Sequence, residues 1–250
     1  MKIGVYSDVH SNLIALREVL ACYEKMDDIE YFTCLGDVVG YGAYPQECSD
    51  IVRAHVRYTV LGNHDAAVSG RMDYNYYYPA ARKALDHHTA LLSDENLAWL
   101  KSLPYKEYEG GICYCHGCPV SPENFDYVFT PEQAQDLMAH WDDLAHVTLI
   151  GHSHLTKSFR MKQVVGGEPE IEELESDLLH FEPDSKYIVT VGSVGQPRDN
   201  DGRACYTVLD TDAMTIQFFR KDYDIYSAAE AIWDDEHLAP DFGKRLFLGV

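Results

Sequence analysis

The sequence predicts an α/β fold that begins with parallel strands and ends with antiparallel ones. Over the first 65 residues, short runs rich in Val, Ile and Tyr alternate with helical patterns, which is typical of a parallel sheet. After residue 154, successive strand-like runs and a glycine turn at 166–167 indicate antiparallel pairing. Asp, Asn or His stands directly after several of the apolar runs. Polar side chains at neighbouring strand ends share one crevice, so the same pattern predicts a ligand site.

The elements of the first half follow in order. Residues 3–6, 31–35 and 58–61 are expected to be buried strands. A helix with an apolar stripe should follow the first strand, with Ser11 or Asn12 as its N-cap. A second helix should begin near Pro45, since proline suits the first helical turn.

The pattern then loosens, and the remaining elements are placed by turns and caps. A hairpin should turn at Gly110-Gly111, and the capping box that begins at Thr130 should start a helix that runs toward His140. Because both halves supply the predicted crevice, we expect one domain over residues 1–250. The other expected helices cover residues 79–91, 94–102 and 225–233, and the other expected strands cover 147–150, 156–165, 187–191, 204–209 and 215–220.

Composition limits the function. The 250 residues are 46% hydrophobic and 24% charged, as in ordinary globular proteins, and no apolar run is long enough to span a bilayer. The net charge of -21 disfavours long nucleic acid as a partner. Seven irregularly spaced cysteines favour a reduced interior, and the N-terminus shows no signal-peptide pattern. We therefore expect a cytoplasmic protein without membrane contact, and a homo-oligomer is compatible with the sequence.

The residues at the strand ends are of the types that bind metals. Carboxylate, imidazole and amide oxygen together suit Mn, Fe, Zn, Co or Ni rather than Ca. In an extended segment, the spacing of Asp8 and His10, and of His152 and His154, would point both members of a pair to one side. Two ions about 3.5–4 Å apart can clamp a displacement at phosphorus. The candidate ligands, which are too many for one ion, are Asp8, His10, Asp37, Asn63, His116, His152 and His154.

The same residues resemble the calcineurin-like metallophosphoesterase superfamily. The series Asp8-x-His10, Gly36-Asp37, Gly62-Asn63-His64-Asp65, His116 and Gly151-His152-x-His154 matches it in order. The resemblance implies a four-layer α/β/β/α sandwich with two mixed sheets and two divalent metal ions. It implies that Asp37 bridges the ions and that His64 acts at the scissile phosphate. It also implies that Asp8, His10 and His154 hold one ion with Asp37, and that Asn63, His116 and His152 hold the other.

One departure separates the chain from the protein phosphatases of this superfamily. Their Gly-Asp-x-x-Asp-Arg-Gly pattern supplies an Asp that orients the catalytic His. Here Gly40 and Tyr41 replace that Asp and the following Arg, so His64 should lack that partner. The turn after Asp37, and residues 192–199, are more similar to the small prokaryotic branch that includes YfcE-type phosphodiesterases and diadenosine tetraphosphate hydrolases.

Several roles remain open in the sequence. His64 is expected to be catalytic, although it could only fix a loop by a hydrogen bond. Arg198 could bind phosphate or pair with Asp199 in a turn, and Asn12 could bind phosphate or cap its helix. Histidines outside the series, such as His88, are expected to be structural.

Three further stretches have competing interpretations. The tyrosines of residues 74–78 could stack on a base, although packing or a dimer contact is favoured. The cysteines around His116 resemble part of a zinc site, but they lie in an expected strand, so packing is favoured. Eight acidic residues between Lys162 and Lys186 are expected to form a solvated edge that discourages pairing between molecules.

The predicted function is hydrolysis of a small phosphodiester, phosphomonoester or dinucleoside polyphosphate, with a metal-bridging hydroxide as the nucleophile. The cofactors would be two divalent transition-metal ions of unspecified identity. The expected partner is a small phosphoester or nucleotide-like substrate. The alternative is a non-catalytic binding or scaffold protein on the same fold.

Overall fold

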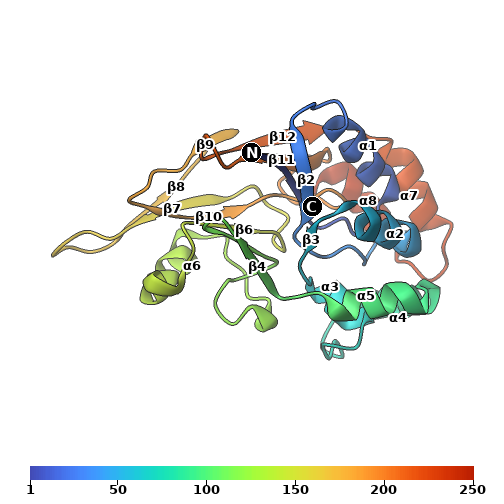
Figure 1. The fold of residues 1–250 in the computed structure, drawn as a ribbon. Coiled ribbons are helices and arrows are strands. Elements are labelled where there is room, and N and C mark those ends of the chain that lie inside the picture. The colour runs from blue at the N-terminus through green and yellow to red at the C-terminus, as the bar shows by residue number, and fades with distance from the viewer.

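Two six-stranded mixed sheets form the centre of the structure, a computed structural model that describes all 250 residues (Figure 1). The first sheet has the order β3-β2-β1-β11-β12-β9. Its β1–β2 and β2–β3 pairs are parallel, and the remaining pairs are antiparallel. Its strands are β1 Lys2–Tyr6, β2 Ile29–Cys34, β3 Tyr58–Thr59, β9 Leu178–His180, β11 Ala204–Asp210 and β12 Thr215–Lys221.

The second sheet has the order β4-β5-β6-β10-β7-β8. Strand β6 pairs in parallel with β5 and β10, and the outer pairs are antiparallel. Its strands are β4 Lys106–Glu109, β5 Ile112–Cys115, β6 Val147–Ile150, β7 Ser158–Lys162, β8 Glu170–Glu173 and β10 Lys186–Thr190.

Helices flank the sheets. On the side of the first sheet lie α1, α2, α7 and α8, and α6 lies against the second sheet (Figure 1). No helix is long and apolar enough to cross a membrane. The helices are α1 Leu13–Tyr23, α2 Pro45–His55, α3 Asn63–Val68, α4 Pro79–Leu91, α5 Asp94–Ser102, α6 Pro131–Asp136, α7 Ile225–Trp233 and α8 Pro240–Leu248, with 3₁₀ helices at Pro122–Asn124 and Leu137–Asp143.

The core explains the layers. Successive side chains of a strand point to opposite faces of the sheet. In β10, Tyr187 and Val189 face the first sheet across the central core, while Ile188 packs under α6. In β1, Ile3 and Val5 enter the same central core, and Tyr6 lies beneath α1. The four-layer α/β/β/α sandwich expected from the resemblance is confirmed.

Most expected elements form, with four differences. The segment Leu137–Asp143 is 3₁₀ rather than a continuation of α6, and β3 has only two residues. Helices α3 and α8 were not predicted. The acidic stretch contributes β8 and β9, which are outer strands of the two sheets. The interpretation of that stretch as a charged sheet edge is therefore confirmed, although its strands were missed.

Candidate metal centre

The site lies where the loops after β1, β2, β5 and β6 meet α3. Five candidate ligands, Asp8, His10, Asp37, His152 and His154, have backbone φ angles between 48° and 64°, the left-handed region that such residues rarely adopt. The expectation that the pairs 8/10 and 152/154 lie in extended segments is therefore wrong. Their side chains converge because these tight loops turn, and strained backbone of this kind clusters at functional sites.

Two glycines allow the loops to approach the carboxylates. A Cβ atom at Gly62 would lie 2.1 Å from Asp37 Oδ1, and one at Gly151 would lie 2.5 Å from Asp8 Oδ2. The space beside each carboxylate is instead used for a hydrogen bond. The amide of His64 donates to Asp37 Oδ1 over 2.9 Å, and the amide of His152 donates to the Asp8 carboxylate.

The seven predicted ligands come together in one buried cluster. Asp8, His10 and His154 form one group of potential ligand atoms, and Asp37, His116 and His152 form another. Asp37 lies between them, since its Oδ2 is 3.6 Å from His10 Nε2 and 3.3 Å from His116 Nε2. Asn63 Oδ1 lies 3.1 Å from His116 Nε2.

The ring nitrogens of His10 and His154 provide a test of whether a cation fits. Each Nδ1 faces a backbone carbonyl, that of Val39 for His10 and that of Gln196 for His154. A carbonyl only accepts hydrogen bonds, so both Nδ1 atoms carry the proton. The two Nε2 atoms, 3.0 Å apart, then point lone pairs at each other. A shared cation would remove this repulsion, and the two carbonyls hold the rings in the orientation that ligands to such an ion would need.

The charge states also suit a cation. Burial lowers the pKa of His10, His152 and His154, that of His152 to about 3, so these imidazoles are neutral and able to ligate. Burial raises the pKa of the Asp8 and Asp37 carboxyls, but the adjacent imidazoles outweigh it and the net pKa of both is lowered. Two buried carboxylates therefore carry negative charge at neutral pH, which calls for a positive partner.

His116 responds to the same carboxylates. Burial disfavours its charged form, but Asp37 outweighs this effect and raises the pKa of His116 to about 9. Its Nδ1 donates to the carbonyl of Leu35 over 2.7 Å, so Nε2 is the nitrogen that faces Asp37 and Asn63. A metal ion in this position would take the place of the Nε2 proton.

His64 lies beside this cluster and lacks the expected partner. Its Nδ1 is buried and has no hydrogen-bond partner in the protein, and a Cβ at Gly40 would lie 2.4 Å from that atom. The loss of the orienting Asp is thus a feature of the structure as well as of the sequence. The ring instead packs against Tyr41, with centroids 4.6 Å apart. Burial lowers the pKa of His64 to about 4.

An open cavity of about 430 Å³ adjoins the cluster. Arg198 is the only Lys or Arg that lines it, and Asp199 pairs with Arg220 instead of with Arg198. The turn interpretation of an Arg198–Asp199 pair is therefore wrong. The cavity is also lined by Asp37, Asn63, His64, His152 and His154, and by the aromatic residues Tyr41, Tyr76, Tyr77, Tyr78, Phe125 and Tyr127.

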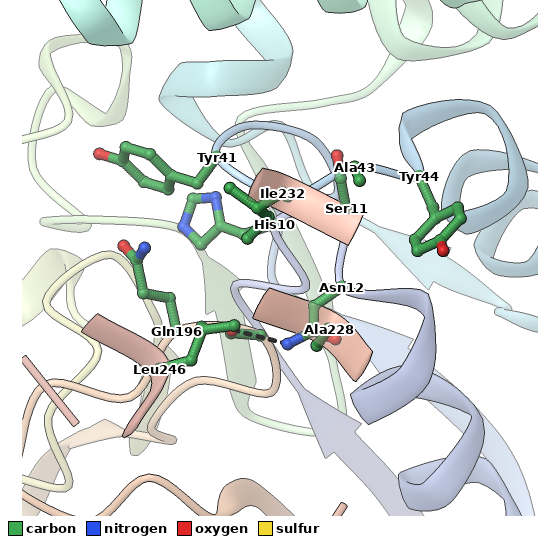
Figure 2. A pocket seen from close by; sticks show the side chains of 12 residues that line it. His10, Ser11, Asn12, Tyr41, Ala43, Tyr44, Gln196, Ala228, Ile232 and Leu246 are labelled. Carbon is green, nitrogen blue, oxygen red and sulfur yellow. Dashed lines mark hydrogen bonds between the residues drawn. The ribbon is translucent and has the colours of Figure 1, made fainter. Parts of the chain in front are cut away.

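Asn12 does not reach this cavity. Its Oδ1 accepts the Ala15 amide and caps α1, and its Nδ2 donates to the carbonyl of Gly195 over 3.0 Å. Figure 2 shows this amide turned toward the chain beside Gln196. Asn12 lines a separate cavity of about 10 Å³. The capping interpretation of Asn12 is confirmed, and the structure does not bring its side chain to the larger cavity beside the candidate ligands.

Sequence reasoning missed several contributors to the site. Asp65 accepts the amides of Gly62 and Val39 and so joins two of the loops. His88 accepts the Gly40 amide at Nδ1 and donates from Nε2 to the carbonyl of Gly42. The Tyr77 hydroxyl accepts a hydrogen bond from Asn63, and the Tyr127 ring stacks on that of His152. Asp65 had a signal in its place within Gly62-Asn63-His64-Asp65, and Tyr77 had one in the tyrosine run 74–78, although the contact of Tyr77 with Asn63 was not foreseen.

A further histidine group lies outside this site. His87, Asp235 and His237 have ligand atoms close together. The two imidazoles stack with centroids 4.3 Å apart and an interplanar angle of 7°. Rings in parallel planes cannot both direct in-plane lone pairs at one ion. The group instead joins α4 to the α7–α8 connection through a 2.8 Å contact between His87 and Asp235. No metal-ligand cluster contains a cysteine, and all seven cysteines are free.

A two-sheet sandwich with buried Asp and His clusters at its loops is the architecture of a metal-dependent hydrolase. The family model of the calcineurin-like phosphoesterases matches residues 1–190. The chain therefore belongs to the calcineurin-like phosphoesterase family, as the sequence resemblance implied. Its class of activity is metal-dependent hydrolysis of phosphoric esters, which favours the enzyme over the binding or scaffold alternative.

Individual proteins support the same conclusion. The chain is 36% identical to the uncharacterized protein MJ0912 of Methanocaldococcus jannaschii, over 99% of this chain and 98% of that protein. It superposes on a metallophosphoesterase from Sphaerobacter thermophilus with a TM-score of 0.82 and 32% identity, covering 100% of this chain and 99% of that one. The hypothetical protein PH1004 from Pyrococcus horikoshii OT3 shares the fold, with a TM-score of 0.78, 18% identity and coverage of 100% and 98%.

Proposed function

We propose that the protein hydrolyses small phosphoesters with two divalent metal ions held on either side of Asp37. The observation that carries this proposal is the position of Asp37 Oδ2, which faces His10 Nε2 and His116 Nε2 from between two ligand groups. Asp8, His10 and His154 would hold the first ion, and Asn63, His116 and His152 the second. The donor set of carboxylate, imidazole and amide suits Mn, Fe, Zn, Co or Ni.

The metal ions, Arg198 and His64 would have different roles in the reaction. When bound, two metal ions neutralise phosphate charge and lower the pKa of water, so that a nucleophile forms near neutral pH. Arg198 would bind a non-bridging phosphate oxygen, since its guanidinium enters the cavity without a carboxylate partner there. His64, whose ring is neutral at pH 7 because burial lowers its pKa to about 4, would donate a hydrogen bond to the leaving oxygen.

The cavity favours a small, nucleotide-like substrate. Its volume of about 430 Å³ lies within the range of about 300–1,000 Å³ typical of small-molecule sites. Three rings in its wall are available for stacking, because Tyr76, Tyr78 and Tyr127 are 74%, 46% and 44% exposed. Aromatic rings stack on bases of any kind. The net charge of -21 would repel long nucleic acid.

The test is hydrolysis of bis(p-nitrophenyl) phosphate with added Mn²⁺, followed by a panel of phosphomonoesters, nucleotides and dinucleoside polyphosphates. Asp37→Asn keeps the size of the side chain and removes its charge. We expect this variant to lose at least about a hundredfold in kcat, because both ions lose their shared ligand. Wild-type activity in Asp37→Asn, or no activity of the wild-type protein with any of the five metals, would refute the proposal.

A further inference from the structure

The candidate ligands are held in two different ways. The imidazoles of His10, His116 and His154 each use Nδ1 to hydrogen bond to a backbone carbonyl. Those carbonyls belong to loops that are themselves tied together by backbone hydrogen bonds, such as His10 N to Asp37 O. The side chains of Asn63 and His152 are held by tyrosines instead. Both belong to the second of the two proposed metal positions.

The contact with Asn63 fixes which way its amide points. Asn63 Nδ2 donates to the hydroxyl oxygen of Tyr77 over 2.6 Å. The opposite end of the amide, Oδ1, therefore faces His116 Nε2 at 3.1 Å. Only the oxygen of an amide can ligate a metal ion, so an amide rotated by 180° would present a donor where a ligand is needed. The Tyr77 hydroxyl selects the rotamer that is competent for binding.

The contact with His152 is a stack. The rings of Tyr127 and His152 lie 4.0 Å apart between centroids, with an interplanar angle of 13°. Such a face contact restricts rotation of the imidazole without occupying either ring nitrogen. Tyr127 reaches this position from the loop between β5 and α6, far in sequence from the tyrosine run that supplies Tyr77.

Both tyrosines also line the cavity in which the substrate would bind. We propose that Tyr77 and Tyr127 are positioning residues that set the affinity of the second metal position. The first position is held by loops and carbonyls and does not depend on them. This inference rests on the proposed two-metal function. It implies that the two ions bind with different affinities and that the cavity wall tunes only the weaker one.

The experiment is a titration of the metal-free, 250-residue protein with Mn²⁺ alone. Binding is monitored by calorimetry and by the electron paramagnetic resonance signal of free Mn²⁺. Tyr77→Phe removes one hydroxyl and keeps the ring. Tyr127→Leu removes the stack. The matched control is Tyr74→Phe, because the Tyr74 hydroxyl donates to Asp86 and Tyr74 does not line the cavity.

We expect two binding steps in the wild-type protein and in Tyr74→Phe. In Tyr77→Phe the second step should weaken about 10- to 100-fold, the usual effect of removing a group that orients a ligand, while the first step stays within about twofold. Tyr127→Leu should affect the same step. Excess Mn²⁺ should restore kcat in Tyr77→Phe, which general damage to the fold would not allow.

The outcomes separate this inference from the proposed function. Two steps of wild-type affinity in both Tyr77→Phe and Tyr127→Leu overturn the inference and leave the two-metal function intact. Equal weakening of both steps also overturns it, because the tyrosines would then support the whole site. If the wild-type chain binds fewer than two ions, the proposed function and the inference both fail.

Discussion

Asp199 is ion-paired with Arg220, and this pair lines a different cavity from the one that its neighbour Arg198 enters. The Arg198 guanidinium donates to Gln196 Oε1 over 3.2 Å and lies over the Tyr41 ring, with its Cζ 5.9 Å from the ring centroid, and no carboxylate pairs with it. An arginine placed in this way beside the candidate metal cluster has donors available for an incoming anion.

The first prediction concerns this arginine. Replacing Arg198 with Ala should lower kcat/KM about 10- to 100-fold, because a hydrogen bond to a charged group is worth about 1.5–3 kcal/mol. Initial rates on a phosphodiester with saturating Mn²⁺ measure the effect. The control is Arg203→Ala, since Arg203 pairs with Asp201 and does not line the cavity. Equal kcat/KM values for Arg198→Ala and Arg203→Ala would show that Arg198 does not bind the substrate.

The second prediction concerns His64. His64→Ala should lower kcat about 10²- to 10³-fold, the usual cost of removing one hydrogen-bond donor from a developing negative charge, while both metal-binding steps persist. Metal titration and single-turnover rates, measured on the same protein sample, separate the two effects. If kcat stays within a few fold of the wild-type value, His64 only holds its loop.

The third prediction concerns metal removal. The Nε2 lone pairs of His10 and His154, which face each other over 3.0 Å, destabilise the metal-free state. Metal at a hundredfold its Kd should raise the free energy of unfolding by about 2.7 kcal/mol per site, or about 5–10 °C in Tm for a chain of this length. Thermal unfolding with Mn²⁺ and with EDTA measures the shift. Asp8→Asn should reduce the shift in Tm. Identical Tm values of the wild-type protein with Mn²⁺ and with EDTA would contradict the account.

The fourth prediction concerns pH. Burial lowers the pKa of His88 to about 3, and its neutral ring accepts the Gly40 amide. In the unfolded chain, His88 has the ordinary pKa of about 6.5. Between about pH 3 and pH 6.5, the unfolded chain therefore binds more protons than the folded protein. Stability should thus fall as the pH falls below about 6.5. The contribution of His88 between pH 7.5 and 5.5 is about 1.4 kcal/mol.

Urea unfolding in EDTA at these two pH values tests the fourth prediction. His88→Gln can still accept and donate a hydrogen bond but does not titrate in this range. The stability of His88→Gln should depend less on pH than that of the wild-type protein. An equally steep dependence in the variant would show that His88 does not contribute.

Much of the fold was predictable because its signals are local. The strand ends at Asp8, Asp37 and His152 stand out as polar residues after apolar runs, and the hairpin between β4 and β5 forms at its two glycines. Helix α8 was missed because, although Pro240 occupies its first turn, its N-cap Ala239 has no capping side chain. Strand β8 was missed because its glutamates hide the strand pattern, and β9 was missed because it has only three residues.

The site was predictable as a set of candidate metal ligands that cluster in the fold, but its geometry was not predictable. Residue type and order identified the seven side chains, whereas the left-handed backbone at His10 and His154 has no signature in the sequence. The contacts of Tyr77 with Asn63 and of Tyr127 with His152 join distant segments. Such pairings depend on tertiary structure, because the two partners are far apart in the chain and neither has a local pattern that marks the other.

The most direct test of the central claim is an anomalous difference map from crystals grown with Mn²⁺. The account predicts two peaks roughly 3.5–4 Å apart on either side of the Asp37 carboxylate. One should be bounded by Asp8, His10 and His154, and the other by Asn63, His116 and His152. A single peak, or no peak within reach of Asp37, would contradict it.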